Sequence, residues 1–259
     1  MSAETSSCVQ PDPGTVAPDY WELTRQPLPS AIFLLPLLLI YEIGVVVLSQ
    51  AGELSARNGA DHWIREGLLS VGFQQAHLLP TLILIALAIW HFVGKFPHKI
   101  SGELLSGMLA ESLLFAVVLV VIGQTQDLLF QQWSTHELLA MFPANSSSIA
   151  ISYIGAGIYE EVLFRGILCT LLYAGGRSLK IPMMASLIFS MIVSSLLFSG
   201  AHYIGPAADQ YSHFSFLFRA CAGMYFAGLF FCRGLGIAIG AHTAYDLLVG
   251  LLLPAMMAN

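Results

Sequence analysis

The chain has 259 residues, of which 56% are hydrophobic and only 10% are charged, and its mean hydropathy is +0.74. This composition lies outside the range of soluble globular proteins, so a soluble enzyme is excluded. The net charge of −6 and the lack of a basic cluster argue against a nucleic-acid partner, because nucleic-acid binding depends on grouped Lys and Arg. We expect the lipid bilayer to be the solvent for most of this chain.

The first 28 residues are polar and rich in Pro, Ser, Thr and Asp. They lack the basic start and the small-residue cleavage site of a secretory signal. Residues 1–28 are therefore predicted to form a disordered tail outside the membrane, followed by a membrane span that is retained. The four cysteines show no CxxC spacing, so neither a disulfide framework nor a thiolate zinc site is predicted.

Seven apolar stretches follow, each close to the roughly 20 residues that a spanning helix needs. They are Pro29–Gln50, Ala76–Lys95, Glu103–Gln124, Ile149–Tyr173, Pro182–Tyr203, Phe214–Cys232 and Gly234–Pro254. Helices are expected because these stretches are about twice as long as a barrel strand. A further segment, Asp127–Phe142, mixes apolar and polar residues and is predicted to lie in the interface or to re-enter the membrane. The predicted fold class is all-α, a polytopic transmembrane helical bundle with about 7–8 spans.

Ionisable side chains within predicted spans are the candidates for function, because their burial in lipid is costly and they usually face a polar interior. The candidates are Glu42, Glu111, Glu160, Glu161, Arg165, Arg219, His242 and Asp246, with His202 near the end of a span. The other histidines lack such company and are interpreted as interfacial or structural residues: His62, His77, His91, His98, His136 and His213.

Two of the acidic candidates are adjacent but face different ways. Glu161 and Arg165 are one helical turn apart, so they can form an ion pair that either supports a site or merely joins two helices. Glu160 points about 100° away around the helix and has no obvious partner in its own segment. Glu160 is therefore the better candidate for a general base.

The two histidine candidates also have companions one turn away. Phe198 and His202 are separated by small residues that let another helix or a substrate approach closely, although a lone histidine near a span end is more often interfacial. His242 and Asp246 present an imidazole and a carboxylate on one face, which suits proton exchange or metal binding. The alternative is a polar pair that packs against Arg219 or another helix.

Together, Glu160, His202, His242 and Asp246 are the residue types of a hydrolytic site with an activated water. Other hydrolase signatures are absent from the sequence, namely Gly-x-Ser-x-Gly, paired membrane Asp motifs and His-Glu-x-x-His.

With these residues, the chain resembles the CAAX protease and bacteriocin-processing (CPBP, also called Abi) family of intramembrane proteases, which is related to the CAAX prenyl endopeptidases. The family motifs Glu-Glu-x-x-x-Arg, Phe-x-x-x-His and His-x-x-x-Asn/Asp correspond, in order, to Glu160, Glu161 and Arg165, to Phe198 and His202, and to His242 and Asp246. The prenyl endopeptidases usually have Asn at the last position. The resemblance implies a catalytic transmembrane core over residues 149–255, preceded by N-terminal spans and an interfacial segment over residues 29–148.

The resemblance also implies a set of roles. Glu160 is expected to activate water with help from His202, while His242 and Asp246 bind the water or stabilise the oxyanion. Glu161 and Arg165 are expected to support the first motif. Phe198 is expected to support the second motif. Zinc is an open possibility at Glu160, His202, His242 and Asp246, and a metal-free glutamate mechanism is favoured.

The expected partners are the lipid bilayer and a membrane-embedded or lipid-anchored peptide or protein. The simplest location is a multi-pass position in a bacterial plasma membrane. Two other functions fit the same residues. The first is a transporter or channel that uses Glu42, Glu111, Glu160 and Asp246 as an ion path, and the second is a non-catalytic immunity or scaffold protein.

Overall fold

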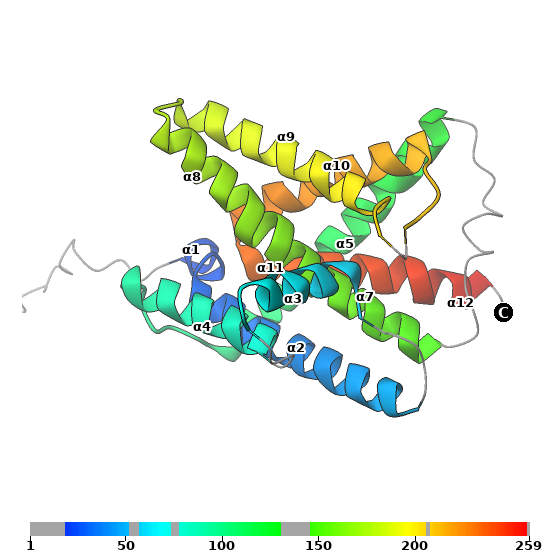
Figure 1. The fold of residues 1–259 in the computed structure, drawn as a ribbon, viewed down its shortest axis with the longest axis horizontal. Coiled ribbons are helices and arrows are strands. Elements are labelled where there is room, and N and C mark those ends of the chain that lie inside the picture. The colour runs from blue at the N-terminus through cyan, green and yellow to red at the C-terminus, as the bar shows by residue number, and fades with distance from the viewer. Residues whose placement is uncertain (1–18, 52–56, 74–77, 131–145, 206–207, 258–259) are drawn as a thin grey trace, which may run out of the picture.

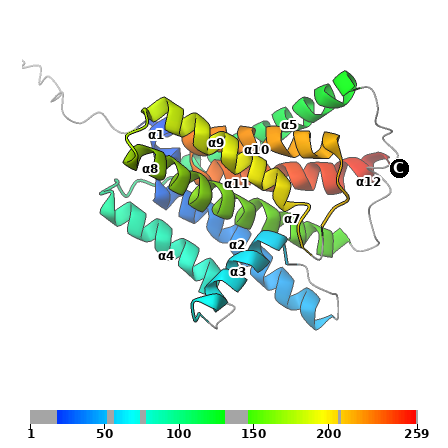
Figure 2. The same ribbon diagram turned by 45° about the horizontal axis from the view of Figure 1, so that its top comes forward.

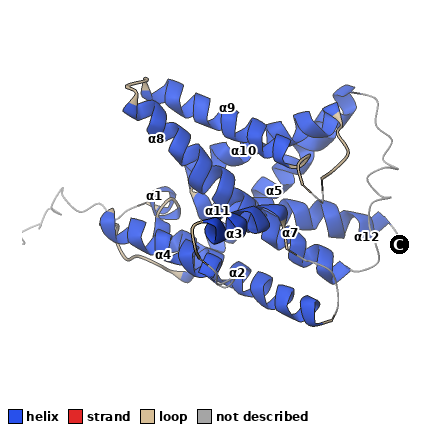
Figure 3. Ribbon diagram, in the orientation of Figure 1, coloured by secondary structure: helices blue, strands red, loops and turns tan. Residues whose placement is uncertain are grey.

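In a computed structural model, the described residues are 19–51, 57–73, 78–130, 146–205 and 208–257. Within these ranges the only regular secondary structure is helical (Figure 3). The helices in chain order are α1 (Tyr20–Thr24), α2 (Pro27–Gln50), α3 (Gly59–Ser70), α4 (Leu78–Val93), α5 (Gly102–Phe130), α7 (Ser146–Glu161), η1 (Val162–Cys169), α8 (Thr170–Ser178), α9 (Met183–Ala201), α10 (His213–Arg233), α11 (Leu235–Leu247), η2 (Leu248–Leu252) and α12 (Leu253–Met257). The two η segments are π-helices.

The protein is a multi-pass helical bundle, as the hydropathy pattern predicts. Among the described residues, five helical segments are long and apolar enough to cross a membrane: Pro27–Gln50, Gly102–Gln126, Met183–Ala201, His213–Arg233 and Leu235–Met256. The predicted span Ala76–Lys95 forms the shorter apolar helix α4. The predicted span Ile149–Tyr173 lies within the consecutive helices α7, η1 and α8, which cross the molecule as one long diagonal rod (Figure 1). Three charged residues interrupt its apolar run.

Two expected segments differ from the structure or lie partly outside it. Residues 1–18 of the expected tail are outside the described ranges, but α1 and the start of α2 fall within the tail's last ten positions. The guanidinium of Arg233 lies 3.8 Å from the ring centroid of Trp21, and this contact holds α1 against the bundle. Of the expected segment Asp127–Phe142, the first residues continue α5 to Phe130, and residues 131–142 are outside the described ranges.

Helix α11 lies inside the bundle, where it contacts α2, α5, α7 and α10 (Figures 1 and 2). Its residues from Leu235 to Thr243 are all buried. The contact with α7 depends on Gly157, because a Cβ there would lie 2.0 Å from Oγ1 of Thr243 and 2.7 Å from its backbone nitrogen. This close approach brings the end of α7 beside the middle of α11.

The loop expected between the first two spans contains the amphipathic helix α3. Asn58 caps its N-terminus, where the side chain accepts a hydrogen bond from the backbone of Ala60 at 2.7 Å. Helix α3 lies across α2 and α7 in both views (Figures 1 and 2) and contacts α7. A charged segment of the N-terminal half is thereby placed next to the acidic end of α7.

Candidate active site

The polar residues of the three sequence motifs come from helices far apart in the chain and lie close together. Glu160 is near the end of α7, His202 caps the C-terminus of α9, and His242 is on α11. Oε2 of Glu160 is 4.0 Å from Nε2 of His202 and 3.9 Å from Nε2 of His242. Oδ2 of Asp246 is 3.5 Å from the same Nε2 of His242. These four side chains line one small polar space.

This space is largely buried, but three of its side chains keep some exposed surface. The side chains of Glu160, Asp246 and His202 keep 11%, 19% and 24% of their surface exposed. The side chain of His242 is only 6% exposed. The inner imidazole is therefore the least exposed of the four side chains.

His202 is oriented by the way α9 ends. Its Nδ1 lies 2.9 Å from the backbone oxygen of Phe198, one turn earlier, so its Nε2 is the nitrogen that faces Glu160. Beyond the end of the helix the chain turns at Gly205, whose φ of +106° suits glycine. The backbone oxygen of His202 then accepts a hydrogen bond from the backbone N–H of Asp209 at 2.9 Å.

Phe198 packs between the motifs. Its ring lies 5.1 Å from the ring of His202 and 6.0 Å from the ring of His242, both in edge contacts. The guanidinium of Arg165 lies 4.4 Å from its centroid. Phe198 therefore touches both imidazoles and the arginine but offers no reacting atom.

His242 is fixed from two sides. Its Nδ1 is 2.8 Å from Oε1 of Glu161, and its ring stacks on Phe226 with a centroid separation of 4.4 Å. Glu161 also forms an ion pair with Nη1 of Arg165 at 2.9 Å, which favours its charged form. A carboxylate is therefore the acceptor that faces Nδ1 of His242. The proton of a neutral His242 then belongs on Nδ1, which leaves the Nε2 lone pair directed toward Glu160 and Asp246.

The ion pair between Glu161 and Arg165 has no exposed surface on either side chain. Arg165 lies in the π-helix η1, and its Nη2 donates to the backbone oxygen of Gly223 on α10 at 3.1 Å. π-Helical turns are rare and frequent at functional sites. Here the pair joins α7 to α10 and supplies the charged partner of His242.

Asn58 is a contact of the site that the sequence did not reveal. Its Nδ2 donates to Oε1 of Glu160 at 2.9 Å, across 102 positions of chain. An asparagine before Gly59 is a recognisable signal for a helix N-cap. This N-cap signal does not predict the contact with Glu160, because only the packing of α3 on α7 creates that contact.

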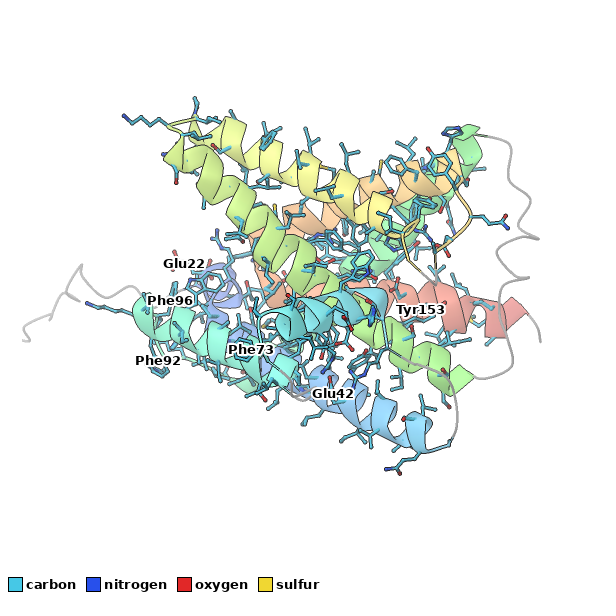
Figure 4. The ribbon with its side chains drawn as sticks, in the orientation of Figure 1. Glu22, Glu42, Phe73, Phe92, Phe96 and Tyr153 are labelled. Carbon is cyan, nitrogen blue, oxygen red and sulfur yellow. The ribbon has the colours of Figure 1, made fainter. Side chains whose placement is uncertain are left out.

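The other membrane-embedded acids named from the sequence have arginine partners. Glu42, labelled on α2 in Figure 4, pairs with Arg65 at 2.9 Å and Arg57 at 3.5 Å. Glu111 pairs with Arg233 at 2.7 Å. Arg219 in turn pairs with Asp209, just beyond the end of α9. These pairs are separate from the space between Glu160 and the two histidines.

The donor atoms of the site are of the kinds found in zinc centres, but most of their separations are wider. Two imidazoles and two carboxylates are ligands that zinc accepts, but tetrahedral zinc with bonds of about 2.0–2.1 Å holds its donors roughly 3.3 Å apart. Glu160 is 4.0 and 3.9 Å from the two histidine nitrogens. Among the described residues, no group of three His, Cys, Asp or Glu side chains has the arrangement of a metal site. As placed, Glu160 is therefore farther from both imidazoles than two ligands of one tetrahedral zinc would be, while Asp246 at 3.5 Å from His242 is close to that separation.

Residues 143–248 match the family model of the Rce1-like type II CAAX prenyl endopeptidases. The matched segment contains all three motifs, from Glu160 to Asp246. This segment belongs to the CAAX protease family. Comparison with curated proteins and with solved structures gave no match. The candidate spans and the matched segment together support a multi-pass membrane protein whose residues 143–248 are similar to CAAX proteases.

Proposed function

We propose that this protein is an intramembrane endopeptidase that hydrolyses a peptide bond of a membrane-associated substrate with water activated by Glu160. One observation carries the proposal: Oε2 of Glu160 is about equally far from Nε2 of His202 and Nε2 of His242, at 4.0 and 3.9 Å. Two hydrogen bonds of about 2.8 Å to one water molecule span roughly 4.0–4.6 Å between the partners. The spacing therefore suits a shared water molecule.

In this proposal Glu160 is the general base. It takes a proton from the water as the water attacks the scissile carbonyl, and later delivers that proton to the leaving amine. His202 helps to orient the water through Nε2, because its Nδ1 is engaged by its own helix. Glu160 and His202 thus act on the nucleophile.

His242 and Asp246 are assigned to the opposite side of the reacting carbon. The imidazole is held by Glu161 and by the ring of Phe226, so it needs little reorganisation as charge develops. The imidazolium form, which has taken its second proton from solvent onto Nε2 before the attack, donates that N–H to the oxyanion and keeps the proton when the oxyanion collapses. Asp246, 3.5 Å away, stabilises that protonated form. Glu161 and Arg165 position the first motif and touch no substrate in this proposal.

The proposed mechanism uses the four side chains alone and includes no step through a metal. The favoured substrate is a membrane-embedded or lipid-anchored peptide, since the family and the spanning helices both fit a membrane-associated partner. A prenylated CAAX tail is one member of that class. A bacterial plasma membrane remains the proposed location.

The transporter reading is less well supported. An ion path needs acids whose charge is available, yet Glu42 is paired with two arginines and Glu111 with Arg233. Two of the four carboxylates grouped from the sequence, Glu42 and Glu111, are thus engaged by arginines, apart from Glu160 and Asp246 beside His242. The non-catalytic reading predicts that replacement of Glu160 leaves the function intact.

The experiment is cleavage by purified protein in liposomes of fluorescence-quenched peptides that end in farnesylated, geranylgeranylated or unprenylated CAAX tails. We expect the wild type to cut at least one lipid-anchored peptide and Glu160→Gln to lose at least about 100-fold in kcat. Glu103→Gln, an exposed acid at the start of α5, is the matched control and keeps its activity. No cleavage by the wild type, or an active Glu160→Gln, contradicts the proposal. A Glu160-dependent ion flux without cleavage favours the transporter.

A further inference from the structure

We propose that Asn58 is a positioning residue for Glu160, supplied by the N-terminal half of the chain. It lies outside residues 143–248, the part of the chain that matches the protease family. Its Nδ2 is 2.9 Å from Oε1 of Glu160, while Oε2 of the same carboxylate faces the two histidines. The inference rests on the proposed function, in which Oε2 receives the proton of the attacking water.

The amide of Asn58 has only one orientation that satisfies its neighbours. The other end of the amide lies 2.7 Å from the backbone nitrogen of Ala60, which can only donate. That end must therefore be the oxygen, which leaves the NH₂ group facing Glu160. The bond to the carboxylate is charge-assisted, which makes it stronger than a bond between neutral groups.

Asn58 is itself held in place without help from Glu160. Its backbone N–H donates to the hydroxyl of Tyr41 at 3.3 Å, and that hydroxyl donates to Oδ2 of Asp61 at 2.8 Å. Asp61 is fully buried and pairs with Arg57 at 2.8 Å and with Arg65. The start of α3 is thus fixed to α2 by a neutralised network, and Asn58 is a rigid donor.

The two carboxylate oxygens of Glu160 therefore have different partners. The terminal torsion of a glutamate is broad, so an untethered carboxylate samples many orientations. The bond from Asn58 occupies Oε1 and restricts this torsion, so Oε2 stays directed at the space between His202 and His242. Loss of the donor should reduce the fraction of molecules in the reactive geometry and leave substrate contacts unchanged.

The test uses the full-length protein in liposomes, a lipid-anchored peptide cut by the wild type, and two Asn58 variants. Asn58→Ser keeps a good N-cap for α3 but lacks the amide donor, while Asn58→Ala loses both. We expect kcat to fall by about 10- to 100-fold in both variants, with KM unchanged. The melting temperature should fall for Asn58→Ala and stay near the wild-type value for Asn58→Ser.

A merely structural role predicts the opposite pattern, in which Asn58→Ser has wild-type kcat and only Asn58→Ala is impaired. That result overturns the inference. If Asn58→Ser does not fold, Asn58→Asp replaces it, since aspartate keeps the shape and the cap but presents a carboxylate to Glu160. Its kcat should fall at least as far as expected for serine, and wild-type kcat overturns the inference.

The two proposals fail in different ways. An active Glu160→Gln contradicts the proposed function itself. An inactive Glu160→Gln together with fully active Asn58→Ser leaves the protease standing and removes only the role of Asn58.

Discussion

Nδ1 of His242 lies 2.8 Å from Oε1 of Glu161, although the two residues are 81 positions apart. The same oxygen is 2.9 Å from Nη1 of Arg165. One carboxylate oxygen therefore links the imidazole of α11 to the arginine of η1. Glu161 thus lies between an imidazole and a guanidinium, and we expect the site to depend on its charge.

Glu161→Gln should remove that charge while nearly preserving the shape. We expect kcat on a lipid-anchored peptide to fall by about 10- to 100-fold, because His242 loses its charged acceptor and its tautomer is no longer fixed. The measurement is steady-state cleavage in liposomes, with Glu103→Gln as the control. Unchanged kcat contradicts the orienting role of Glu161.

Arg165→Met should act mainly on stability. Breaking a buried ion pair leaves an uncompensated charge, which costs about 3–5 kcal/mol, and here the remaining carboxylate is fully buried. We expect a clear drop in the thermal unfolding midpoint in detergent. The double variant Arg165→Met/Glu161→Leu removes both charges and should recover much of that stability without recovering cleavage. Failure of the double variant to recover stability argues that the loss of the arginine's other contacts dominates.

Gly157→Ala should separate α7 from α11. The new Cβ would meet the side chain of Thr243 at 2.0 Å and its backbone nitrogen at 2.7 Å, so both stability and cleavage should fall. Gly175→Ala is the matched control, because nothing lies within 4 Å of its Cβ position. Adding Thr243→Ala to Gly157→Ala should not restore activity, since the backbone clash remains. Wild-type behaviour of Gly157→Ala refutes the close contact.

Asp246→Asn tests the position at which this chain departs from the usual residue of the prenyl endopeptidases. Asparagine keeps a polar group near Nε2 of His242, now 3.5 Å from the carboxylate, but it cannot stabilise a protonated imidazole by charge. We expect kcat to fall by about tenfold for asparagine and by about 100-fold or more for Asp246→Leu. Equal activity of all three proteins removes Asp246 from the mechanism.

Metal removal distinguishes the two catalytic types. The described donor spacing predicts that purified protein carries well below one zinc per chain and that 1,10-phenanthroline leaves cleavage unchanged. Elemental analysis of the active preparation and a chelator titration provide the measurement. Stoichiometric zinc, with activity lost on chelation and restored by zinc, contradicts the metal-free mechanism.

Much of the fold was predictable because a bilayer accepts few structures. Backbone groups in hydrocarbon must pair within their own segment, so long apolar stretches such as Gly234–Pro254 predict helices without knowledge of their neighbours. The stretch Ile149–Tyr173 was harder, since the charges of Glu160 and Arg165 interrupt its hydropathy. Helix α3 was not predicted, because a short charged helix outside the apolar stretches has no comparable constraint.

The candidate site residues could be predicted because ionisable residues are rare in membrane spans. Ionisable groups in lipid are costly, so Glu160, His242 and Asp246 stand out against an apolar background. Their partners do not stand out. Phe226, Gly223 and Asn58 are ordinary residues in the sequence and are tied to the site only by contacts between helices.

Amino-acid order alone determined that this chain forms membrane helices with acids and histidines in their apolar runs, because local composition controls both helix length and the cost of burying charge. Only the tertiary structure decided that the oxygens of Glu160 have different partners and that Glu161 rather than Glu160 holds Nδ1 of His242. Such assignments depend on the depth and rotation of one helix against another. Those are set by side-chain packing, as at Gly157, and have no periodic signature in the chain.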